Sequence, residues 1–212
     1  EVEAVISRVL ADDECIDAVL RLKFSRLPKL VRSLLKPFAR KSIQKEMANV
    51  QTVKDFQDKV EPYLAHMINT TVTNFSVSGM ENLNPEQAYL FVSNHRDITL
   101  DPALVNYALH QNGRDTVRIA IGDNLLSKPF VTDLMRINKS FIVKRNEKAP
   151  RKLLAALKQL SQYIHHSINE DQHSVWIAQR EGRAKNGIDK TDAAILKMFA
   201  IHAGRKADFA EV

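Results

Sequence analysis

Short apolar segments alternate with longer helical segments through the second part of the chain, and this alternation limits the fold more than any other feature. The segments that are typical of strands are 72–79, 88–94, 116–123, 139–145 and 173–182. The segments with helical periodicity are 101–113, 128–138, 150–168 and 190–204. Strands that alternate with helices form a largely parallel sheet flanked by helices. We therefore predict an α/β domain over residues 71–212, with one further strand expected at 204–212, where the chain stops, so that the domain is expected to be truncated.

Residues 1–70 have helical periodicity and form a separate N-terminal segment in this prediction. Its central part is strongly basic, since nine basic residues and one acid lie between Arg21 and Met47. The bases that fall on one helical face are Arg26, Lys29, Arg32, Lys36 and Arg40. Apolar side chains follow the i, i+3, i+4 pattern of the opposite face, namely Leu27, Leu30, Val31, Leu34, Leu35 and Phe38. Pro28 and Pro37 are expected to start or bend this helix. Two interpretations stay open: contact with anionic lipid headgroups, or a helix packed on the domain with a solvated basic back.

The overall composition favours an anionic partner. The net charge is +6 over 212 residues, and the single cysteine, Cys15, excludes an internal disulfide and is typical of a reducing compartment. The anion could belong to a nucleic acid, a phosphorylated small molecule or a membrane surface. A nucleic-acid partner is disfavoured, because the basic segment has no recognisable motif and no interleaved aromatic residues. No apolar run approaches the ~20 residues that a membrane-spanning helix needs.

Polar residues follow four of the predicted strands at the point where each ends. His95, Asp123 and Arg145 follow three of them, and the turn from Arg180 to Arg183 follows the fourth. Ligands bind at the carboxyl ends of the strands in open parallel sheets. We therefore expect these side chains to gather along one edge of the sheet.

His95 is the candidate general base of this edge, because a carboxylate that fixes its tautomer makes an imidazole basic at neutral pH. Either Asp101 or Asp97 could be that carboxylate. Asp101 precedes Pro102, which is also the pattern of a helix N-cap. We expect the strand to end at Asn94, and Asp101 to cap the next helix with one oxygen while its other oxygen reaches the imidazole.

Two basic turns are candidates for binding a phosphate. Their residues are Arg145, Arg180, Glu181, Gly182, Arg183 and Lys185. Guanidinium groups and backbone N–H groups suit a phosphate, and the glycine permits a close approach of the backbone. The alternative for either turn is a solvated basic loop.

The series "NHRDITLD", "SFIVKR" and "REGR" resembles the blocks of the glycerolipid (glycerophosphate and lysophosphatidate) acyltransferases over roughly residues 75–200. Asn94 and His95 match the N-H-x4-D block, Arg145 matches the arginine of the second block, and Glu181 with Gly182 matches the third, E-G-T-R. The chain departs from this pattern in three ways. One extra residue separates His95 from Asp101, Arg183 stands in the place of the usual threonine, and the family's fourth block is absent.

The resemblance implies a mechanism and a set of partners. His95 would take a proton from a glycerol hydroxyl, whose oxygen would attack the thioester of an acyl-CoA or an acyl-carrier protein, with no cofactor and no metal. The basic blocks would hold the phosphate of a glycerophosphate or lysophospholipid acceptor. The basic helix would then contact an anionic membrane surface, and the protein would be peripheral on the cytoplasmic face. The alternatives are a non-catalytic module of the same fold that binds anionic lipid, which the altered spacing favours, and a thioester hydrolase in which His95 activates water.

Overall fold

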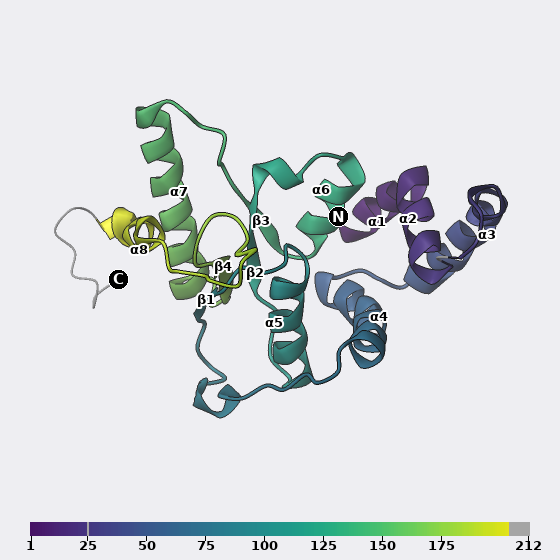
Figure 1. The fold of residues 1–212 in the computed structure, drawn as a ribbon, viewed down its shortest axis with the longest axis horizontal. Coiled ribbons are helices and arrows are strands. Elements are labelled where there is room, and N and C mark those ends of the chain that lie inside the picture. Colours follow the sequence, from purple (N-terminus) through teal and green to yellow (C-terminus); the bar gives the residue numbers. More distant parts are fainter. Residues whose placement is uncertain (25, 204–212) are drawn as a thin grey trace. The chain divides into compact units, whose positions relative to one another are not determined.

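The computed structural model describes residues 1–24 and 26–203 (Figure 1). The chain divides into two compact units. The first comprises Glu1–Val72 with Leu126–Lys139, and the second comprises Thr73–Leu125 with Ser140–Val212. The further strand expected at 204–212 lies outside the described residues.

The first unit is helical. Its helices are α1 (Val2–Ala11), α2 (Asp13–Lys23), α3 (Lys29–Met47), α4 (Val53–Thr71) and α6 (Pro129–Ile137). Side-chain caps begin two of them: Asp12 accepts hydrogen bonds from the N–H groups of Glu14 and Cys15 at the start of α2, and Thr52 forms a capping box with Asp55 at the start of α4. Buried apolar side chains join the helices into one core, namely Ile6, Leu10, Ile16, Leu20, Val50 and Ile137. The N-terminal helical segment predicted from the sequence is therefore present.

Helix α3 begins directly after Pro28, as predicted. Unlike a packed amphipathic helix, it exposes part of its apolar face and directs some of its bases toward neighbouring backbone. The side chains of Leu30, Leu34 and Phe38 are 82%, 74% and 74% exposed, whereas Leu35, Ala39, Ile43 and Met47 pack against the core. Two of the predicted solvated bases point inward. Arg32 donates to the carbonyl of Leu27, and Arg40 donates to the carbonyl of Leu10. Within the helical unit, part of the predicted apolar face is therefore exposed, and two of the predicted solvated bases are bonded to backbone carbonyls.

The second unit contains a sheet of four parallel strands, as predicted. The strands are β1 (Leu90–Ser93), β2 (Arg118–Gly122), β3 (Ser140–Val143) and β4 (Val175–Ala178), in the order β1-β4-β2-β3. Leu90 pairs with Val175, and Ile119 pairs with both Ser140 and Trp176. Parallel pairing throughout brings the carboxyl ends of all four strands to one edge.

In this unit, helices follow β1, β3 and β4 and flank the sheet. They are α5 (Leu100–Gln111), α7 (Pro150–Asn169) and α8 (Ala193–Ala200). Short 3₁₀ turns cover Met80–Asn82, Asp123–Leu125 and Ile201–Ala203. Leu160 and Ile164 of α7 pack with Val175 and Ile177 of β4 and with Met198 of α8, and Figure 1 shows α7 and α8 together beside the strands. The helices α5, α7 and α8 correspond to predicted helical segments, whereas the sequence predicts no 3₁₀ turn at Met80–Asn82 or Asp123–Leu125.

One predicted strand is absent. Residues 72–79 form no strand, although their β-branched residues alternate. High strand propensity means only that the side chains fit a pleated, half-buried sheet surface. A strand forms only where a neighbouring strand pairs with its backbone N–H and C=O groups. In the described chain β1 and β3 are the edges of the sheet, and 72–79 pairs with neither. The prediction of a strand at these residues is therefore wrong.

Candidate active site

The carboxyl edge of the sheet carries a cavity of about 460 Å³, to which the segments after all four strands contribute. Its polar lining includes His95 after β1, Asn124 after β2, Arg145 after β3, and Arg180 to Arg183 after β4. The predicted gathering of His95 with the two basic turns is therefore present. Asp123, directly after β2, does not line the cavity and accepts a hydrogen bond from Asn146.

His95 is fixed in this cavity with one ring nitrogen bound. Its residue is 9% exposed, and Nδ1 lies 2.9 Å from Asp101 Oδ2. A carboxylate only accepts hydrogen bonds, so Nδ1 carries a proton, and in the neutral imidazole Nε2 then has the lone pair. In the described part of the chain no hydrogen bond reaches Nε2. The edge of the ring contacts Trp176, with centroids 6.5 Å apart and planes at 70°. This arrangement leaves Nε2 free to accept a proton from a ligand.

The loop from His95 to Asp101 accommodates its extra residue as a hydrogen-bonded turn. Asp97 Oδ1 accepts from the N–H groups of Thr99 and Leu100, at 2.8 Å each. The backbone N–H of Leu100, then that of Thr99, lowers the pKa of Asp97. Asp101 Oδ2 accepts from the N–H groups of Arg96 and Asp97, at 2.8 and 3.0 Å. Because the turn brings the two ends of the loop closer together, the Asp101 carboxylate still reaches the imidazole of His95.

Two details of the predicted geometry need correction. The strand ends at Ser93, one residue earlier than expected, and α5 begins at Leu100 with Thr99 as its N-cap residue. Asp101 does not cap the helix, because its oxygen accepts from N–H groups of the preceding loop. Asp97 instead accepts a hydrogen bond from the N–H group of Leu100, at the start of the helix. The predicted hydrogen bond from His95 to Asp101 is confirmed, and Asp97 makes none to the imidazole in the structure.

The two basic turns face each other across the cavity. Arg145 Nη1 lies 3.9 Å from Glu181 Oε1, with the Arg145 side chain 29% exposed. Gly182 has φ of 77°, a left-handed conformation that suits glycine. Arg180 and Arg183 also line the cavity, whereas Lys185 is exposed and lies outside its lining. The result is a rim beside His95 that is rich in basic side chains and also includes the carboxylates of Glu147, Glu181 and Asp192.

Gly122 at the end of β2 makes room for Arg145. A Cβ atom at this position would lie 2.8 Å from Arg145 Nε and would also meet Asn124 Oδ1. Such contacts are shorter than van der Waals distance, so a side chain at this position would displace the guanidinium. The sequence alone does not distinguish this glycine from one that ends a strand.

The inner wall of the cavity is apolar. Leu153, Leu157 and Leu160 of α7 and Ile195 and Met198 of α8 form part of this wall. The cavity thus combines a free imidazole nitrogen, a basic rim and an apolar wall. Such an arrangement suits a ligand with an anionic group and a hydrocarbon chain.

Sequence reasoning missed three residues that organise this site. Trp176 on β4 contacts the His95 ring and donates from Nε1 to Ser93 Oγ at 3.0 Å. Gln179 donates to Asn94 Oδ1 at 2.6 Å, and Asp189 accepts from the backbone N–H of His95. All three are distant from His95 in sequence, and no local pattern marks them.

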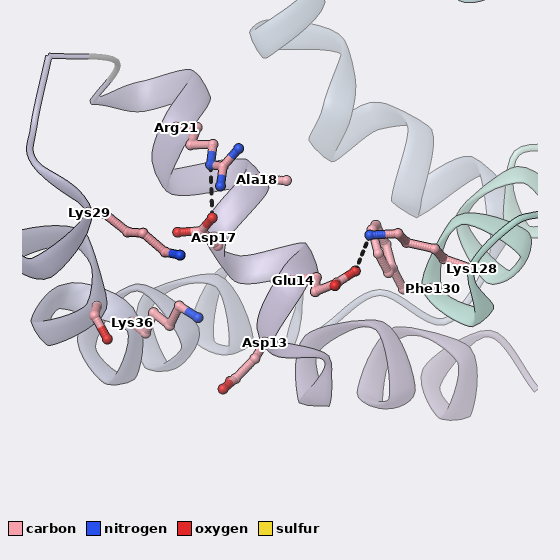
Figure 2. A pocket seen from close by; sticks show the side chains of 10 residues that line it. Asp13, Glu14, Asp17, Ala18, Arg21, Lys29, Lys36, Lys128 and Phe130 are labelled. Carbon is pink, nitrogen blue, oxygen red and sulfur yellow. Dashed lines mark hydrogen bonds and ion pairs between the residues drawn. The ribbon is translucent and has the colours of Figure 1, made fainter.

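A second hollow, of about 420 Å³, lies in the helical unit (Figure 2). Some of its acids and bases pair with one another. Asp17 lies 2.8 Å from Arg21, and Glu14 pairs with Lys128. Lys29 and Lys36 of α3 lie beside these pairs. Neither histidine nor cysteine occurs among the described residues that line it.

Two structural features are absent from the described residues. No group of three or more His, Cys, Asp or Glu side chains in the ranges 1–24 and 26–203 is arranged to hold a metal ion. None of the described helices is both long enough and apolar enough to span a membrane.

Comparison with known families identifies the chain. The family model described as Acyltransferase matches residues 74–202, which is more than half of the chain. The chain therefore belongs to this family, that of the glycerolipid acyltransferases, whose members use an acyl donor and a lipid acceptor. A comparison with curated proteins found no match.

Proposed function

We propose that this acyltransferase moves a fatty acyl group from an acyl thioester to a hydroxyl of a glycerophosphate or lysophospholipid, with His95 as the general base. The observation that carries the proposal is the hydrogen bond from His95 Nδ1 to Asp101 Oδ2 in a cavity that has both a basic rim and an apolar wall. Asp101 holds the imidazole in the tautomer whose Nε2 accepts a proton, and its charge stabilises the imidazolium that results.

The proposed reaction needs no acyl-enzyme. Nε2 of His95 takes the proton of the acceptor's hydroxyl while that oxygen forms a bond to the thioester carbonyl carbon. The C–S bond of the tetrahedral intermediate then breaks, and the leaving thiolate takes the proton back from the imidazolium. General-base catalysis of this kind contributes about 10²–10⁴-fold.

The basic rim would bind the phosphate of the acceptor, and the apolar wall would bind the acyl chain of the donor. Arg145, Arg180 and Arg183 would hold the acceptor's phosphate, with Glu181 orienting Arg145 and with Gly182 allowing the backbone to approach. Lys185 would attract the phosphate from outside the cavity lining. The apolar wall on α7 and α8 would take the acyl chain. The donor is an acyl-CoA or an acyl-carrier protein, and the reaction needs no cofactor.

Helix α3 would bring the protein to a membrane. Leu30, Leu34 and Phe38 are exposed at i, i+4 and i+8, and exposed bases flank them, including Lys29, Lys41 and Lys45. An exposed apolar stripe with basic neighbours suits the surface of an anionic bilayer. We place the protein on the cytoplasmic face of the membrane as a peripheral protein, where its lipid product would leave.

The experiment compares acyl transfer by the wild type with that by His95→Ala. The purified protein receives an acyl-CoA with glycerol 3-phosphate, with lysophosphatidate or with no acceptor, and both the free thiol and the acylated acceptor are measured. We expect acylated acceptor from the wild type and a loss of about 10²-fold or more in His95→Ala. His166→Ala is the matched control, because His166 is exposed and pairs with Asp171.

The same assay separates the alternatives. Thiol release without an acceptor would indicate a thioester hydrolase. Vesicle binding with no transfer, and no difference between wild type and His95→Ala, would indicate a non-catalytic anionic-lipid-binding module. The altered spacing no longer favours that module, since the turn at Asp97 restores the contact between His95 and Asp101.

A further inference from the structure

A buried carboxylate lies behind His95. The side chain of Asp189 is 1% exposed, and its Oδ2 accepts a hydrogen bond from the backbone N–H of His95. In the described structure its other oxygen, Oδ1, is buried and has no hydrogen-bond partner. A buried carboxylate with so few partners is costly for folding, so stability alone does not account for its place.

The segment that carries Asp189 holds His95 from both sides. The carbonyl of His95 accepts from the N–H of Ala184 at 2.8 Å, while its N–H donates to Asp189. Gln179 joins this segment to the residue before His95, because its side-chain nitrogen donates to the carbonyl of Asp189 at 3.2 Å and to Asn94 Oδ1 at 2.6 Å. With the bond to Asp101, His95 is fixed at its N–H, its C=O and its ring.

The same carboxylate lies near the basic rim. Arg180 Nε is 3.9 Å from Asp189 Oδ1, which is within ion-pair range but longer than a hydrogen bond. The Arg180 side chain is 39% exposed and lines the cavity. Asp189 therefore contacts the backbone of the proposed base with one oxygen and faces a proposed phosphate ligand with the other.

We propose that Asp189 is a positioning residue that holds the backbone of His95 and the guanidinium of Arg180 in a fixed relation. Binding of the acceptor's phosphate at Arg180 then places its hydroxyl at Nε2 of His95. The proposal rests on the acyl transfer proposed above. Asp189 itself touches neither substrate nor the reacting atoms.

Two substitutions separate the two contacts. Asp189→Ala removes the acceptor of the His95 N–H, and we expect kcat to fall about 10- to 150-fold, the range for loss of a hydrogen bond to a charged group. Asp189→Asn keeps an oxygen for that N–H but loses the charge beside Arg180. We expect it to restore most of kcat and to raise the KM of the acceptor roughly 2- to 5-fold or more. The KM of the acyl donor should be unchanged in both.

Asn186→Ala is the matched control. Asn186 lies in the same segment, and its Oδ1 accepts only a local hydrogen bond from the N–H of Ile188, at 3.1 Å. We expect its kcat and both KM values to equal those of the wild type. Thermal unfolding of each variant gives the folded fraction, to which kcat is normalised. Normalised kcat values and acceptor KM values that match the wild type in both Asp189 variants would overturn the proposal, since a merely structural residue lowers only the folded fraction.

A second measurement does not depend on catalysis. Hydrogen exchange of the His95 amide, followed by NMR, should be slow in the wild type and in Asp189→Asn, and faster in Asp189→Ala. If the wild type transfers no acyl group, the proposed function fails, and the exchange rates still decide whether Asp189 holds His95. Equal exchange in all three proteins would contradict the positioning role.

Discussion

Asp101 Oδ2 accepts three hydrogen bonds at once, from His95 Nδ1 at 2.9 Å and from the backbone N–H groups of Arg96 and Asp97 at 2.8 and 3.0 Å. One oxygen therefore fixes both the imidazole and the loop that precedes it. The loop cannot change its conformation without moving the carboxylate. The proposed catalytic pair is thus preorganised before any substrate binds.

Asp101→Asn should lower kcat about 10- to 150-fold, because the amide no longer stabilises the imidazolium with a full charge. The amide oxygen still accepts from the loop, so the protein should fold. Asp97→Asn serves as the comparison, since Asp97 makes no hydrogen bond to the imidazole and Asn also caps a helix well. Steady-state kinetics of both variants check this prediction. A larger loss of kcat in Asp97→Asn would show that the assignment of the partner is wrong.

Asp97 should give the protein a pH-dependent part of its stability. The N–H groups of Leu100 and Thr99, followed by the charge of Arg183, lower its pKa below the ordinary value of 3.8. A lowered pKa in the folded state stabilises the protein above the unfolded value, and this stabilisation is lost as the pH falls through the folded value. The melting temperature of the wild type relative to Asp97→Asn should therefore be constant near neutral pH and should decline below about pH 4. A difference that stays constant at lower pH would show that these contacts do not lower the pKa of Asp97.

Gly122→Ala should act on the acceptor through Arg145. The new Cβ would lie 2.4 Å from Asn124 Oδ1 and 2.8 Å from Arg145 Nε, so both side chains must shift. We expect the KM of the glycerophosphate or lysophospholipid to rise about 10-fold or more while the KM of the acyl donor is unchanged. In a double-mutant cycle, the effect of Gly122→Ala should disappear in an Arg145→Ala background. Additive effects would mean that Gly122 acts by another route.

The exposed face of α3 should determine vesicle binding. Leu34→Ser with Phe38→Ser should weaken sedimentation with both neutral and anionic vesicles, because each apolar side chain loses its burial in the bilayer. Lys41→Gln with Lys45→Gln should weaken binding only to anionic vesicles, by roughly 30-fold at low salt, from about 1 kcal/mol per base. Val60→Ser on α4, where Val60 is 39% exposed, is the control and should bind like the wild type. Unchanged binding in both double variants would mean that α3 does not face a membrane.

The sequence by itself determined the four strands of the sheet, the helices that follow them, and the edge at which the polar residues meet. Apolar periodicity is a local property, and parallel strands with helical connections have their carboxyl ends at one edge. The positions of β1, β2, β3 and β4 followed from these two rules. So did the gathering of His95, Arg145 and Arg180 in one cavity.

Only the tertiary structure decided which groups touch. Spacing allowed either Asp97 or Asp101 to reach His95, and the turn that shortens the loop depends on backbone N–H groups that the sequence does not place. The inward direction of Arg40 depends on a free carbonyl at Leu10, which is far along the chain. Asp189 and Trp176 meet His95 through contacts across more than 80 residues, and side chains brought together over such separations leave no local pattern. Residues 72–79 have strand-like composition but no neighbouring strand, because pairing depends on what else occupies the sheet.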